Sequence, residues 1–66
     1  MPLDNEKIKS LRTKKGLTQA QAAKAARIGG RQRWHDIESG RKGGITVTTL
    51  DRVAAALGVH ARELLK

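Results

Sequence analysis

The side chains that could do chemistry gather in one stretch of the sequence, IGGRQRWHDIESGRKGG, which spans residues 28 to 44. His35 and Glu38 stand three residues apart, a spacing that places two metal ligands on one face of a helix. One such pair supplies two ligands at best, and the chain has no cysteine to add thiolates. We therefore expect neither a metal site nor a cofactor. The sequence also lacks a nucleophile paired with a base and a phosphate-cradling loop, so we do not expect an enzyme.

Trp34 is the only aromatic residue of the chain, and it stands among charges. Its ring is either an exposed platform on which a ligand stacks or an anchor of the core. On a helical wheel, Trp34 and Ile37 lie about 60° apart and define an apolar side. We predict that both residues are structural, with the ring packed on small alanines of the preceding helix. These alanines are Ala22, Ala23 and Ala26.

The other sides of the same helical stretch are polar. They carry Arg31, Gln32, His35 and Asp36. A polar face on a helix whose opposite side is buried is a candidate binding surface. Two alternatives stay open. Arg31 is otherwise a solvated charge or a phosphate contact, and Asp36 an acid that only lowers the net charge.

The positive charge of the chain is unevenly distributed. The net charge is +8 for 66 residues. Residues 7–42 hold eleven basic side chains against two acidic ones, a net +9, whereas residues 43–66 hold three against two, a net +1. A one-sided positive field is typical of a surface that binds a polyanion. The alternative is that the charge serves only solubility.

The length of 66 residues indicates one domain, residues 1–66, with a thin core. Without cysteines the chain cannot form disulfides. The longest apolar run, Val53 to Leu57, is far shorter than the ~20 residues of a membrane-spanning helix. The N-terminus is charged and lacks the apolar core of a signal peptide. We expect a cytoplasmic protein that does not bind membranes.

The pattern of caps and apolar residues predicts five short helices and no strand, hence a compact all-α domain. Asp4, Thr18 and Thr46 are expected to cap the first, second and fourth helices. The helices are expected over residues 5–15, 19–26, 31–39, 47–57 and 61–65. The fourth should bury a stripe made of Val47, Leu50, Val53, Ala54 and Leu57. Residues 40–44 are predicted to form a flexible basic loop.

Several short motifs occur in a characteristic order. They are Gly16-Leu17-Thr18-Gln19 with Ala23, the segment from Trp34 to Gly40, the run from Thr49 to Val59, and Glu63 to Leu65. Over residues 8–65 the chain resembles the phage repressor and Cro family of helix-turn-helix domains. Two features depart from the family pattern: the turn near Gly29-Gly30 holds one residue more, and the loop before the fourth helix is longer.

The resemblance implies roles for individual residues. Base contacts are implied for Arg31, Gln32 and Asp36, with His35 beside them on the same face. Phosphate contacts are implied for Thr18, Gln19, Arg33, Arg41 and Lys42, which would position the domain without reading sequence. Arg12 and Glu38 match a pair that ties the first helix to the third, so we read them as structural.

These expectations favour a transcriptional regulator, most simply a repressor, that binds double-stranded DNA with its third helix in the major groove. It would act as a homodimer on a two-fold operator. The alternative is an antitoxin that binds a toxin protein and represses its own operon. That role needs an apolar surface, for which the sequence offers Val59, Leu64 and Leu65.

Overall fold

The computed structural model describes residues 3–40 and 45–66, which form four α-helices and one 3-10 helix. The elements are α1 (Asn5–Lys14), α2 (Gln19–Ala26), α3 (Arg31–Ser39), α4 (Val47–Leu57) and η1 (Ala61–Leu64). The predicted all-α class is confirmed. The count of five α-helices is wrong, because the last predicted helix is a single turn of 3-10 helix, a form common in such short pieces.

Side chains cap three helices where the sequence predicts it. Asp4 Oδ1 accepts a hydrogen bond from the Lys7 amide at 3.2 Å, and Thr46 Oγ1 accepts one from the Thr49 amide at 3.1 Å. At α2 the capping box is complete: Thr18 Oγ1 accepts from the Gln21 amide, and Gln21 Oε1 accepts from the Thr18 amide. These bonds satisfy amides that have no partner within the helix. Helix starts are therefore set by local sequence.

The ends of the helices use left-handed backbone geometry. Gly40 and Gly58 follow α3 and α4 with φ of 72°, whereas α2 ends at Arg27 with φ of 58°. A side chain in this conformation costs about 1 kcal/mol relative to glycine. Arg52 of α4 donates to the Arg27 carbonyl at 3.1 Å and so ties this end to a second helix. The unusual residue lies in the turn where the sequence departs from the family pattern.

The predicted burial of Trp34 is confirmed. Its side chain is completely buried and is the largest in the core. The three alanines of α2 lie in the same cluster, together with side chains from every other helix. The buried apolar residues are Ile8, Ala22, Ala23, Ala26, Trp34, Ile37, Val53, Ala54, Leu57 and Leu64. Because alanine is small, α2 and α3 can approach closely while the indole ring fills the space between helices.

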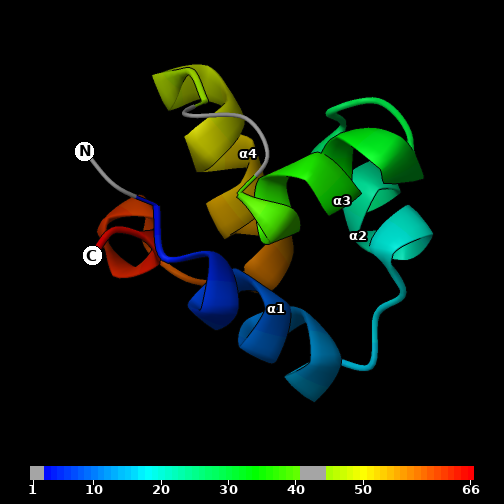
Figure 1. Cartoon of the computed structure of the whole chain (residues 1–66), viewed down its shortest axis with the longest axis horizontal. Coiled ribbons are helices and arrows are strands. Elements are labelled where there is room, and N and C mark those ends of the chain that lie inside the picture. Colours follow the sequence, from blue (N-terminus) through cyan, green and yellow to red (C-terminus); the bar gives the residue numbers. More distant parts are fainter. Residues whose placement is uncertain (1–2, 41–44) are drawn as a thin grey trace.

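The stripe predicted on α4 is wrong at its first residue. Val47 is 73% exposed, Leu50 is half-buried, and only Val53, Ala54 and Leu57 are fully buried. Figure 1 shows the reason: the first turn of α4 rises beyond the other helices, whereas its later turns pass through the centre of the molecule. Burial therefore increases along α4 from its N-terminus.

The two ends of the described chain lie side by side (Figure 1). Leu3 pairs with Leu65 in an isolated antiparallel bridge, and the Asp4 amide donates to the Leu64 carbonyl at 2.7 Å. Leu64 is completely buried, so η1 closes the core against α1 and α4. No helix among residues 3–40 and 45–66 is long and apolar enough to cross a membrane.

Replacing Trp34 by alanine should unfold the domain or nearly so. Truncating a fully buried tryptophan costs about 3–5 kcal/mol, which is comparable to the whole stability of a small domain. Thermal melting followed by circular dichroism measures the loss. The matched control is Val47→Ala, which removes an exposed side chain and should change stability by less than about 0.5 kcal/mol. A Trp34→Ala protein that melts with the parent would contradict the buried anchor.

Candidate nucleic-acid interface

The carboxylate of Glu38, near the end of α3, receives hydrogen bonds from three helices. Arg12 of α1 donates through Nε to Oε2 at 2.5 Å and through its terminal nitrogen to Oε1 at 3.2 Å. Trp34 donates its indole N–H to Oε2, and Gln19 of α2 donates its amide to Oε1 at 3.4 Å. We call this set of four side chains the Glu38 cluster. It fixes α3 against both preceding helices.

Arg12 extends the cluster to the turn between α1 and α2. Its second terminal nitrogen donates to the Leu17 carbonyl at 2.7 Å. The side chains of Arg12 and Glu38 are 12% and 5% exposed, so the ion pair is nearly shielded from water. A shielded pair stabilises a fold only when further hydrogen bonds satisfy both partners, as they do here. The pair suggested by the resemblance is thus present, and its surroundings mark it as structural.

The cluster lowers the pKa of Glu38. Burial by itself raises the pKa, because it disfavours the charged form. Hydrogen bonds from Arg12, Trp34 and Gln19, together with the positive charge of Arg12, outweigh burial and hold the pKa below its ordinary value of 4.5. Glu38 is therefore a charged carboxylate at neutral pH, and it accepts hydrogen bonds from the other three members of the cluster.

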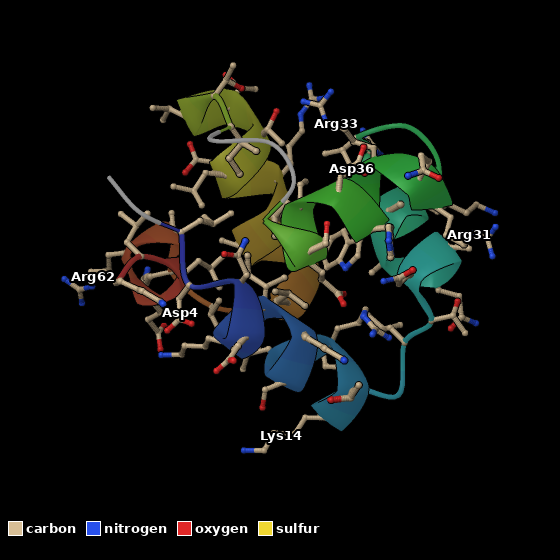
Figure 2. The ribbon with its side chains drawn as sticks, viewed as in Figure 1. Asp4, Lys14, Arg31, Arg33, Asp36 and Arg62 are labelled. Atoms are coloured by element: carbon tan, nitrogen blue, oxygen red, sulfur yellow. The ribbon has the colours of Figure 1, made fainter. Side chains whose placement is uncertain are left out.

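The side of α3 that faces away from the core is open. Arg31, Gln32, Arg33 and His35 are exposed, and Asp36 is half-buried. Figure 2 shows Arg31 at the start of α3 and Arg33 further along it, both reaching away from the body of the domain. Across one helical turn, Gln32 Nε2 donates to Asp36 Oδ1 at 3.1 Å. The residues predicted to contact bases thus share one accessible surface.

A shallow hollow lies between this surface and the start of α2. Its volume is about 340 Å³, and it is lined by Gln19, Arg31, Gln32 and His35. A smaller hollow of about 170 Å³ shares Gln19 and His35, so the two are neighbours. The Gln19 amide nitrogen lies 3.5 Å from His35 Nδ1 and bridges the two helices at this point. The sequence motif of α2 and the polar face of α3 therefore meet in space.

The start of α2 attracts negative charge. The capping box uses the amides of Thr18 and Gln21. The amides of Gln19 and Ala20 follow in the first turn of α2, where the helix dipole favours negative charge. The Thr18 hydroxyl accepts from Gln21 and keeps its own proton to donate. Both predicted phosphate contacts on α2 thus lie where an anion would be attracted.

Two predicted phosphate contacts, Arg41 and Lys42, lie outside the described residues, as does most of the predicted basic loop. Lys9, which belongs to none of the sequence motifs, is exposed and lines the smaller hollow beside Gln19 and His35. Its three-residue spacing from Arg12 was the available signal, because residues at that spacing share a helix face.

The metal interpretation of His35 and Glu38 gains no support. Within the described part of the chain, no three side chains of the histidine, cysteine, aspartate or glutamate types gather closely enough to hold a metal ion. Glu38 instead accepts from Arg12 and Trp34. Glu38 therefore holds neighbouring helices in place, and His35 remains an exposed hydrogen-bonding group on α3.

Comparison with known proteins agrees with this geometry. A family model described as a helix-turn-helix domain matches residues 6–66. The chain is similar to a crystal structure of SinR, described as the master regulator for biofilm formation, in complex with DNA. The two sequences are 25% identical, and the match has a TM-score of 0.87 and covers 97% of this chain and 100% of that one. A SinR protein/SinI protein complex matches with the same identity and TM-score, but the chain spans only 61% of that chain. Among curated protein sequences there is no significant match.

The stability of the domain should decrease as the pH decreases, and part of this decrease should depend on Glu38. Because its pKa is lowered in the folded state, its contribution is complete above the pKa of the unfolded chain and is lost as the pH falls through the folded value. The parent should therefore lose melting temperature below about pH 5 more steeply than Glu38→Gln. Glu6→Gln, which alters an exposed acid of α1, is the control and should keep the parental slope. Equal slopes for the parent and Glu38→Gln would show that the cluster does not depend on the charge.

Proposed function

The chain belongs to the phage repressor and Cro family of helix-turn-helix domains, and from this membership we propose that it is a sequence-specific, double-stranded DNA-binding transcriptional regulator. The family is one of DNA-binding regulators and not a class of enzymes. SinR, a structural relative over nearly the whole chain, is itself described as a regulator in complex with DNA. We propose that this protein binds DNA in the same manner, most simply as a repressor.

The observation that carries the proposal is the exposed polar face of α3, held on a fixed base. Trp34 and Ile37 bury one side of the helix, and the Glu38 cluster fixes its end. The helix has nine residues and is about 14 Å long, comparable to the ~12 Å width of the major groove. Inserted there, Arg31, Gln32, His35 and Asp36 would face base edges, while Thr18, Gln19 and Arg33 would contact phosphates.

A single helix of this length reads few base pairs, so we propose that two copies bind a two-fold operator. Half-sites one helical turn apart are separated by about 34–36 Å. The domain measures 26 Å along its longest axis, so two copies fit on successive turns of one DNA face without overlap. Occupying a promoter in this way would block transcription.

A small protein partner is the second candidate, because SinR also occurs in a complex with SinI. The apolar surface considered for an antitoxin is not available as the sequence suggested. Leu64 is completely buried, and Val59 and Leu65 are half-buried. A protein partner would therefore have to bind a different surface. Co-purification of a second small chain from the native host would favour this candidate.

Selection of bound sequences from a random pool of double-stranded DNA tests the proposal directly. We expect one enriched motif with two-fold symmetry, whose half-sites are about 34–36 Å apart or a multiple of that distance. A matched selection with Gln32→Ala should lose preference within each half-site and keep the spacing. A parent protein that enriches no sequence would refute specific recognition. A single unrepeated half-site would refute the dimer.

Arg33 should contribute to affinity without contributing to specificity. Arg33→Ala should weaken binding to specific and random DNA alike, and should lower the slope of log affinity against log salt by about one unit per chain. The control is Arg62→Ala, which removes the same charge from η1, on the side of the domain away from Arg31 in Figure 2. An unchanged slope for Arg33→Ala, with loss confined to the specific site, would place Arg33 on a base edge instead.

A further inference from the structure

The one acid on the exposed face of α3 is bonded to a neighbouring base-reading candidate. Asp36 Oδ1 accepts from Gln32 Nε2 at 3.1 Å, and the two residues stand four apart on the helix. The Gln32 side chain is exposed and lines the larger hollow, so the amide borders the open space into which a ligand would enter. Neither side chain belongs to the core. The bond therefore positions a surface amide that nothing in the core would hold.

A carboxylate decides which way round the glutamine amide lies. The amide end carries two N–H donors on one atom and an acceptor oxygen on the other. The Asp36 carboxylate only accepts hydrogen bonds, so it attracts Nε2 and repels Oε1. The amide turned by 180° would place two acceptors against each other. In the observed orientation one hydrogen of Nε2 is taken, and the second hydrogen and Oε1 remain for a ligand.

The remaining pair of groups matches one base. A donor beside an acceptor complements N7 and N6 of adenine, which accept and donate in the major groove. Guanine presents two acceptors there, O6 and N7, and would meet an unmatched carbonyl oxygen. The chemistry left exposed on Gln32 thus selects adenine over guanine.

We infer that Asp36 is a positioning residue that orients the Gln32 amide for adenine and so determines specificity at one base pair of each half-site. This inference rests on the proposed function and names the base that one residue reads. The inference also gives a reason for the negative charge of Asp36 on a surface that is proposed to bind DNA. Asp36 lowers affinity for every DNA sequence by charge repulsion, and it penalises wrong sequences more strongly.

The experiment repeats the random-pool selection with the parent, Gln32→Ala, Asp36→Ala and Asp36→Asn. The base pair that loses its preference in Gln32→Ala defines the position read by that residue, and the parent should prefer adenine there. Asp36→Ala should reduce this preference by on the order of tenfold. Asp36→Asn should also weaken it, because an asparagine amide can donate as well as accept and so no longer excludes the reversed Gln32 amide, while binding to all DNA tightens.

Asp51→Ala is the matched control for charge. It removes the same negative charge from an exposed position on α4, so it should leave the base preference unchanged. Circular dichroism confirms that each variant is folded. Retention of the adenine preference in Asp36→Ala, or loss of preference at a different base pair, overturns the inference and leaves the proposed function standing. Absence of any preference in the parent overturns the proposed function itself.

Discussion

The structure depends on one carboxylate with several donors. Glu38 lies where α1, α2 and α3 meet, and Arg12, Gln19 and Trp34 all donate to it. A charge so shielded is tolerated only with its partners in place, so the geometry of the three helices is set together. Because Trp34 takes part, the polar cluster and the apolar core share a side chain. The orientation of α3 is consequently fixed both by packing and by directed hydrogen bonds.

A small core explains why such a cluster matters. A chain of 66 residues buries a limited apolar area, and alanines supply much of the surface of α2 that faces the core. Alanine favours the helix and permits close approach, but each buried alanine contributes little hydrophobic free energy. Trp34 provides the volume that the alanines lack. The fold thus combines one large ring, several small side chains and an ion pair.

Because the core and the Glu38 cluster hold α3 from one side, its outer face is free to bind a partner. The residues that hold the helix, Trp34, Ile37 and Glu38, are spaced so that they share one side. The residues on the other side of α3 are not needed for packing, and they include Gln32 and Asp36, which are joined by a hydrogen bond. A rigid helix with ordered polar groups loses little conformational entropy on binding, which favours discrimination between similar DNA sequences.

Local signals in the sequence determined the starts and ends of the helices, since a cap or a glycine acts within a few residues. Periodicity likewise determined that Trp34 is buried, because a helical wheel fixes direction relative to the helix axis. Periodicity does not show how far the neighbouring helices extend along α4, so it predicts a core position for Val47, which is 73% exposed. Only the tertiary structure decides that Gln19 and Trp34 both donate to Glu38. The same is true of the position of Lys9 beside the hollow. Contacts between helices depend on where those helices cross, and that follows from the packing of the whole core.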